Sequence, residues 1–190
     1  MSGPSLTTVL GLDPGSRTAG YAFIRARIAE PRLPRDFVVL DAGVLRASES
    51  LPVCARIGLM HQAIYELMQE HRPEVVVLEK AFADKNISSA LKLGEVRGGF
   101  MAAAGRFGAT VEQITPAEVK KTIAGNGRAD KEQVSLTLRA LMGFDRGQMP
   151  HDVTDALAIS LCYGLSLTTK WALAAALKPR RPTAAKEVSR

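Results

Sequence analysis

The chain has 190 residues, of which 46% are hydrophobic and 23% are charged, with a formal net charge of +6 at pH 7. This length and composition suit one globular domain with a sizeable core. They argue against a membrane protein, because the longest nearly apolar run, residues 156–167, is too short to span a bilayer and no basic and apolar leader is present at the start. The two cysteines lack the spacing of a zinc site or a disulfide framework, so we expect two core thiols in a soluble, cytoplasmic protein.

The first part of the chain predicts three consecutive strands. Residues 8–13, 19–26 and 37–46 alternate or run apolar, contain β-branched residues, and are separated by breaks rich in Gly or Pro. We expect an antiparallel meander. The break at residues 27–36 would then form a long hairpin loop.

The second part predicts helices alternating with strands. Apolar residues three or four apart predict a helix over 53–71, and the uninterrupted Val and Leu run in residues 73–82 predicts a strand that is buried on both faces and ends at Glu79. The remaining expected elements are a helix over about 86–105, a strand over 110–114, helices over 116–124 and 130–142, and a helix from about 151 to 166. This order indicates an α/β fold, with a five-stranded mixed β-sheet flanked by α-helices and parallel in its second half.

The positive charge is concentrated at the C-terminal end. Residues 168–190 contain six basic residues and one acidic residue, a formal charge of +5, which leaves +1 for residues 1–167. We therefore predict a folded domain over 1–167 and a basic C-terminal tail over 168–190. Such a tail suits a polyanion such as nucleic acid, but on charge alone a solvated end without a partner is favoured.

Four carboxylates fall at the ends of the predicted elements. Asp13 ends the first strand and Glu79 ends the fourth. Asp152 and Asp155 lie three residues apart at the start of the last helix, on one face of it. If the first and fourth strands are neighbours, all four acids converge at one sheet edge, and such a cluster becomes stable when hard divalent cations such as Mg²⁺ bind it. Two metals about 4 Å apart are a known device for in-line displacement at phosphorus.

Each acid also has a purely structural explanation. Asp155 could be an exposed helix acid, and Asp152 could interact with the helix N-terminus. Glu79 could cap its strand or pair with Lys80. For Asp152 alone the structural explanation is favoured, whereas the conjunction of all four acids favours a functional site.

The same acids lie in segments that resemble a known family. These segments are, in order, GLDPGSRTAGYA, VLEKAF, KNISSALKLGEVRG, EVKKTIAGNGRADKEQV and HDVTDALA. Over roughly residues 8–167 the chain resembles the RuvC-type Holliday junction resolvases of bacteria. The resemblance implies an RNase H-like nuclease domain over 1–167, a homodimer, two Mg²⁺ ions per active site for which Mn²⁺ can substitute, and paired symmetric nicks across a four-way DNA junction in recombination and repair. It assigns the metal-binding and catalytic acids to Asp13, Glu79, Asp152 and Asp155, and it suggests the RuvA–RuvB branch-migration complex as a further partner.

The resemblance also suggests five DNA contacts. Phe82 would stack on a base near the crossover, although it could equally be a core residue. Lys120 and Lys131 would hold or neutralise the scissile phosphate, and Lys92 and Arg97 would contact phosphates from the second helix. For any single lysine, an ordinary exposed position is the better interpretation from the residue alone.

Several features have no clear counterpart in the family. His151 could join the metal site, bond to an acid or cap the helix, and the last two are favoured. Lys80 follows Glu79 at a position where a neutral amide is common. The roles of the 27–36 loop and of the 168–190 tail stay open.

Other functions share parts of this pattern. Sugar kinases and actin-like ATPases also open with a strand, an Asp and a Gly-rich turn, but they need a second phosphate loop and a second lobe that 190 residues do not supply. A junction-binding scaffold with an inactive site is a non-enzymatic alternative. Nucleases with the same fold that act on linear DNA or RNA are the nearest enzymatic one.

Overall fold

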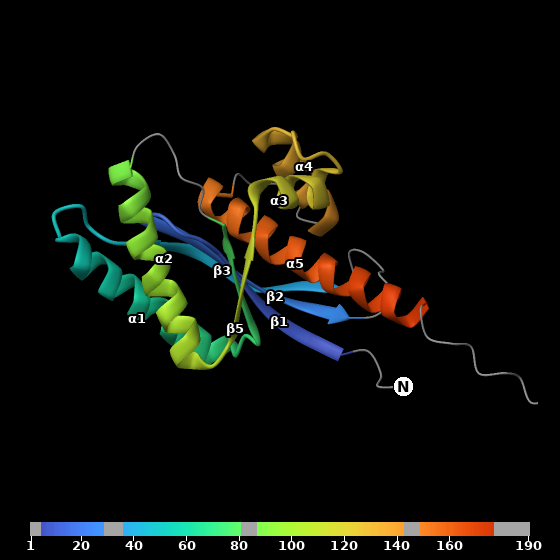
Figure 1. Cartoon of the computed structure of the whole chain (residues 1–190), viewed down its shortest axis with the longest axis horizontal. Coiled ribbons are helices and arrows are strands. Elements are labelled where there is room, and N and C mark those ends of the chain that lie inside the picture. Colours follow the sequence, from blue (N-terminus) through green and yellow to red (C-terminus); the bar gives the residue numbers. More distant parts are fainter. Residues whose placement is uncertain (1–4, 29–35, 81–86, 143–148, 177–190) are drawn as a thin grey trace, which may run out of the picture.

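A five-stranded sheet forms the centre of the protein, seen in a computed structural model that describes residues 5–28, 36–80, 87–142 and 149–176 (Figure 1). The elements are β1 (Ser5–Asp13), β2 (Thr18–Ile28), β3 (Phe37–Arg46), α1 (Val53–His71), β4 (Val75–Glu79), α2 (Ile87–Phe107), β5 (Thr110–Ile114), α3 (Pro116–Ala124), α4 (Lys131–Met142) and α5 (His151–Ala176). The strand order across the sheet is β3-β2-β1-β4-β5. β1 to β3 pair antiparallel, whereas β4 pairs parallel with β1 and with β5.

The structure confirms the predicted element order and the mixed sheet. The helices over 53–71 and 116–124 and the strand over 110–114 have the predicted bounds. The last helix differs, because it continues to Ala176 instead of ending near residue 166. Its added residues include no Gly or Pro and several good helix formers, so nothing in the sequence stops the helix at the predicted domain boundary.

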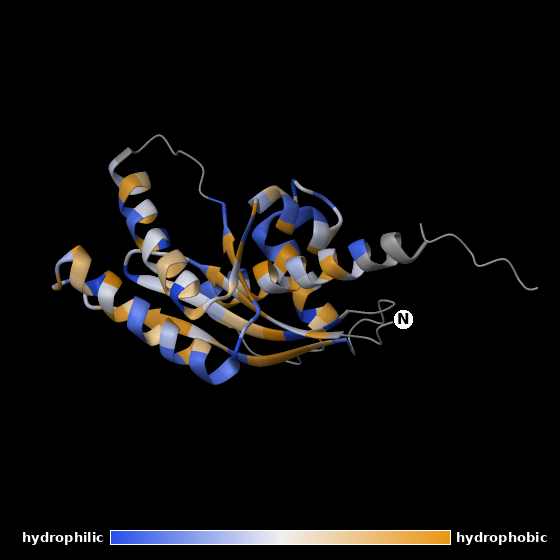
Figure 2. Cartoon of the chain, turned by 60° about the horizontal axis from the view of Figure 1, so that its bottom comes forward, coloured by the Kyte–Doolittle hydropathy of each residue, from blue (hydrophilic) through white to orange (hydrophobic). Residues whose placement is uncertain are grey.

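Helices cover both faces of the sheet. α1 and α2 pack on one face, and α5 with α3 and α4 packs on the other (Figure 1). Within β1 the side chains alternate between the two layers: Val9 belongs to the core under α5, and Leu10 and Leu12 belong to the core under α1 and α2. Figure 2 shows hydrophobic residues along the strands between these layers.

Two glycines allow α5 to lie close against the sheet. A Cβ on Gly11 of β1 would lie 2.7 Å from the backbone nitrogen of Ser160. A Cβ on Gly20 of β2 would clash with the backbone carbonyl of Asp152. Because neither glycine carries a side chain, the first turn of α5 can lie over the end of β1, where Asp13 is located.

The cysteine prediction is half right. Cys162 is buried in α5, but Cys54 is exposed near the start of α1. Cys54 lies off the helix face on which Met60 and Ile64 are buried, so it does not reach the core. Within the described ranges, none of the helices combines the length and the apolar character that a membrane crossing requires.

Candidate active site

The ends of two neighbouring strands supply the first two carboxylates of the site. β1 and β4 run parallel, and Leu12 pairs with Leu78 in their register. Asp13 and Glu79 are the next residues of the two strands, so both carboxylates leave the sheet at the same edge. The condition for the acids to converge, that the first and fourth strands are neighbours, is therefore met.

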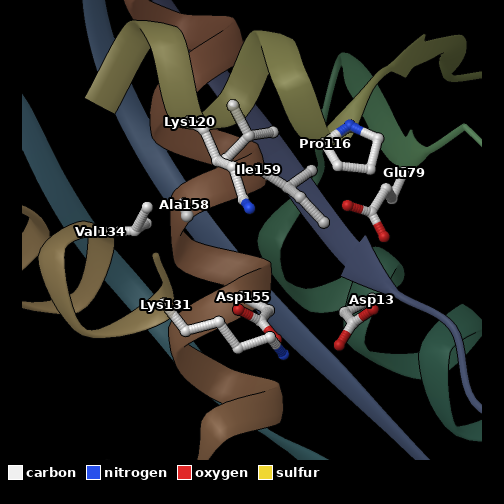
Figure 3. Close-up of a pocket in the computed structure, with 10 residues that line it drawn as sticks. Asp13, Glu79, Pro116, Lys120, Lys131, Val134, Asp155, Ala158 and Ile159 are labelled. Carbon is white, nitrogen blue, oxygen red and sulfur yellow. The ribbon is translucent and has the colours of Figure 1, made fainter. Parts of the chain in front are cut away.

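The third carboxylate comes from α5. Asp155 lines the same cleft as Asp13 and Glu79, and Figure 3 shows the three side chains around one space. The cleft has a volume of about 370 Å³, and its other wall is formed by α3 and α4, which contribute Lys120 and Lys131. Three acids and two lysines from separate parts of the sequence thus share one cavity.

Burial and repulsion from the neighbouring carboxylates make Asp13 an unusually weak acid. The pKa of the Asp13 carboxyl is raised from 3.8 to about 7, first by burial and then by the negative charges of Asp155, Glu79 and Asp152, in this order. The nearby ammonium of Lys131 opposes these effects in part. The cleft therefore holds more negative charge than its lysines neutralise.

The basic residues of the cleft act on the other acids. Burial and then the charge of Asp155 raise the pKa of Glu79, whereas Lys131, Arg97 and Lys120 lower it. Nζ of Lys131 lies 3.2 Å from Oδ2 of Asp155, and this carboxylate raises the pKa of Lys131. Because the Lys131 side chain is 77% exposed, the ion pair adds at most about 1 kcal/mol to stability. Another anion can therefore replace Asp155 as the partner of Lys131.

The donor set of the cleft suits a hard divalent cation. Carboxylate oxygens are the ligands that Mg²⁺ and Mn²⁺ prefer, and a bound cation would offset the repulsion from the other acids that, after burial, raises the pKa of Asp13. Within the part of the chain that the structure describes, no three Asp, Glu, His or Cys side chains lie close enough to enclose one ion. The acids line the walls of the cleft, and their convergence on a metal stays a prediction.

Asp152 lies at the edge of this arrangement. It occupies the first turn of α5 with its backbone carbonyl against Gly20, and it does not line the cleft. Its charge nevertheless contributes to the raised pKa of Asp13. His151, which precedes it, is exposed and lines a neighbouring groove.

The predicted DNA contacts fall in different places. Lys120 and Lys131 lie in the cleft with the acids. Lys92 is exposed on α2, whereas Arg97 of the same helix is only 7% exposed and its guanidinium is bonded within the protein. Phe82 lies outside the described residues. The burial of Arg97 supports a structural role over the predicted phosphate contact.

Two residues near the site were not found from the sequence. Gln113 of β5 accepts a hydrogen bond of 2.9 Å from Arg97, and no local pattern in a short, largely exposed strand indicated this role. Arg139 lines the groove beside the cleft. It lies eight residues after Lys131, hence on the same face of α4, and this spacing could have identified it.

The chain matches the family model described as crossover junction endodeoxyribonuclease RuvC over residues 9–163. It is 42% identical over 163 residues to the crossover junction endodeoxyribonuclease RuvC of Chlorobaculum parvum, spanning 84% of each chain, and 40% identical over 158 residues to that of Halorhodospira halophila, spanning 83% of this chain and 90% of the other. The structure of Thermus thermophilus RuvC in complex with a Holliday junction substrate superimposes with a TM-score of 0.79 at 30% identity, covering 87% of this chain and 97% of that one. The yeast mitochondrial Holliday junction resolvase Ydc2 is 13% identical with a TM-score of 0.59, covering 90% of this chain and 84% of that one, and shares the fold. These likenesses confirm the predicted RNase H-like fold.

Proposed function

Because the chain belongs to the RuvC family of crossover junction endodeoxyribonucleases, we propose that it resolves four-way DNA junctions by paired symmetric nicks in recombination and repair. The observation that carries this proposal is the meeting of Asp13, Glu79 and Asp155 in one cleft. They come from three separate elements, and each lies in one of the segments that resemble the family. A structural role for the acids would not require three elements to direct carboxylates into the same space.

Nucleases of this family are metal-dependent, and we propose that this chain uses two Mg²⁺ ions per active site, for which Mn²⁺ can substitute. Asp13, Glu79, Asp152 and Asp155 would hold them. When bound, such ions supply an activated water and stabilise the leaving oxygen of a phosphodiester. Asp13 must lose its proton before it can serve as a ligand, because only the carboxylate binds a cation well.

The lysines of the cleft would bind and orient the scissile phosphate. Lys131 is largely exposed and pairs with Asp155 only through a surface ion pair, so a phosphate oxygen can take the place of that carboxylate. Lys120 faces the same cleft from α3. Together they would position the phosphodiester against the acids and offset the repulsion between phosphate and carboxylates.

We further propose that the enzyme acts as a homodimer. Paired symmetric nicks need two active sites, and a twofold dimer matches the symmetry of a four-way junction. The exposed side of α2 supports this arrangement: Leu91 is 65% exposed, Met101 is 37% exposed, and the positions of Gly94 and Gly98 have open space around them. Small and apolar residues on one helix side let a second copy approach closely.

The remaining partners follow from the substrate. The RuvA–RuvB branch-migration complex is proposed as a partner because it acts on the same kind of junction. A DNA substrate also supports a cytoplasmic location for the enzyme. The 1–167 nuclease domain and the basic 168–190 tail stay predicted divisions of the chain, and the role of the tail stays open.

A comparison of substrates tests the proposal against its alternatives. The purified protein is incubated with a mobile four-way junction and with a linear duplex of matched sequence, in Mg²⁺ and in chelator. We expect paired nicks in the junction with Mg²⁺ only. Equal cutting of the linear duplex would indicate a general nuclease of this fold, and tight junction binding without any nicking would indicate a scaffold.

A further inference from the structure

A groove leads away from the active-site cleft along the seam between α4 and α5. It has a volume of about 430 Å³ and shares Lys131 and Asp155 with the cleft. A further hollow of about 350 Å³ continues it as far as Met149, and both share Arg139 and His151. The active-site cleft therefore continues into this groove along one side of the helix pair.

Arg139 is the cation in the middle of this groove. Lys131, Ser135 and Arg139 recur every four residues on α4, so they line one face of the helix. Nε of Arg139 is buried and has no hydrogen-bond partner, and Arg139 forms none of the ion pairs found within the described ranges. The Arg139 guanidinium therefore lines the groove without a hydrogen-bond or ion-pair partner from the described ranges, and an anion in the groove would supply one.

The other polar groups of the groove suit an anion that is bound on one side. Ser135 brings a hydroxyl group and His151 brings an exposed imidazole, whereas the hydroxyl of Thr154 donates to the backbone carbonyl of Pro150. Apart from Asp155, which the groove shares with the cleft, the acid that lines the groove is Glu132. A guanidinium is well suited to bind the two unesterified oxygens of a phosphodiester, because its planar donors can engage both.

We propose that this groove binds a second phosphate of the cleaved DNA strand, with Arg139 as the phosphate-binding residue. The proposal rests on the nuclease function proposed above. Eight residues of helix separate Lys131 from Arg139, about 12 Å at 1.5 Å per residue. Because a strand winds round the helix axis, its successive phosphates lie further apart than the rise of about 3.4 Å per nucleotide, so the contacted phosphate lies within about three nucleotides of the cut.

The test combines substitutions with a scan of neutral phosphates. A four-way junction is prepared with single methylphosphonates at successive positions on both sides of the cut, and binding is measured in chelator, over a series of salt concentrations, by fluorescence anisotropy. The proteins are wild type, Arg139→Gln, Arg139→Lys and Arg56→Gln. Arg56 is the matched control because its Nε is likewise buried without a partner, but it belongs to α1 in the opposite layer.

We expect Arg139→Gln to reduce the slope of log K against log salt by about 0.9, the value for a single phosphate, and Arg56→Gln to leave it unchanged. Wild type and Arg56→Gln should bind the junction less tightly when one particular phosphate near the cut is neutral. Neutralising that same phosphate should not change the affinity of Arg139→Gln. A wild-type slope and an unchanged scan in Arg139→Gln would overturn the proposal.

Two further outcomes are decisive. If Arg139→Gln does not fold, Arg139→Lys takes its place, because it keeps the charge but not the paired donors. Arg139→Lys should lose less affinity than wild type when that phosphate is made neutral. An equal loss of affinity contradicts the proposal. If wild type itself neither prefers nor cuts the junction, the nuclease function fails instead. The phosphate-binding role of the groove is then tested on whichever DNA the wild type binds, by comparing the salt slopes and the responses to neutral phosphates of Arg139→Gln and Arg56→Gln.

Discussion

The guanidinium of Arg97 donates a hydrogen bond to the backbone carbonyl of Glu79 and another, of 2.9 Å, to Oε1 of Gln113. Arg97 belongs to α2 and is buried, whereas its two acceptors lie at the end of β4 and on β5. The side chain thus connects a helix to the strand end that presents one of the carboxylates of the cleft.

Replacement of Arg97 tests this role against the predicted DNA contact. Arg97→Gln should lower the free energy of unfolding by roughly 1.5–3 kcal/mol for each hydrogen bond that it removes, as measured by urea denaturation, because it leaves buried acceptors unpaired. The salt dependence of junction binding should not change. Lys92→Gln, an exposed change on the same helix, is the control and should alter stability by less than about 0.5 kcal/mol. A flatter salt dependence with unchanged stability in Arg97→Gln would instead support a phosphate contact.

The raised pKa of Asp13 predicts a particular response to pH. In the absence of metal, the folded state keeps the proton of Asp13 up to about pH 7, whereas the unfolded state loses it near the ordinary value of 3.8. Between these values the folded state binds more protons, so stability falls as pH rises from about 4 through 7. Asp13→Asn cannot titrate, and in chelator it should become more stable than wild type as the pH rises to 8, by at most about 4 kcal/mol.

Thermal melting at pH 5 and pH 8 measures this difference. Added Mg²⁺ should reverse it at pH 8, because only wild type offers a carboxylate at this position. A stability difference between wild type and Asp13→Asn that does not change with pH would mean that Asp13 titrates normally.

Substitutions of Phe82 test how the protein distinguishes a four-way junction from a linear duplex. If its ring stacks on a base at the crossover, Phe82→Ala should weaken junction cutting by the equivalent of about 1–3 kcal/mol, whereas Phe82→Tyr and Phe82→Trp should be tolerated. Nicking and melting temperature are measured on the same preparations. A Phe82→Ala protein that loses about 3–5 kcal/mol of stability yet cuts normally per folded molecule would make Phe82 a core residue.

The C-terminal tail can be tested without cutting into α5. Because the helix continues to Ala176, the deletion removes residues 177–190, which carry most of the positive charge of the predicted tail. For each phosphate that these residues bind, the deletion should reduce the slope of log K against log salt by about 0.9, and we expect a small effect. An unchanged slope would mean that these residues are a solvated end without a role in DNA binding.

Local patterns were sufficient to predict the elements and three of the cleft residues. Periodicity fixed the helices and strands, and acids directly after apolar strands marked the sheet edge where Asp13 and Glu79 lie. The length of α5 was underestimated because a stop was assumed where the sequence contains none. The internal hydrogen bonds of Arg97 were not predicted, because the sequence of α2 does not show which of its faces is buried against β4 and β5.

The position of Asp152 shows the same limit. Its spacing from Asp155 places both on one helix face, but how that face meets the sheet depends on close approaches such as the one at Gly20. The sequence marks Gly20 only as a glycine within a strand. The direction of Asp152 relative to the cleft therefore required the packed structure.

The proposal that the carboxylate cleft cuts DNA junctions with the help of metal can be tested on a prebound four-way junction. Nicking by wild type and by Asp13→Asn is started by adding Mg²⁺. We predict rapid paired nicks by wild type, and no nicks by Asp13→Asn although it binds the junction at least as tightly, because the substitution removes both a metal ligand and a repelling charge. Nicking by Asp13→Asn at the wild-type rate would show that the Asp13 carboxylate is not needed for cleavage.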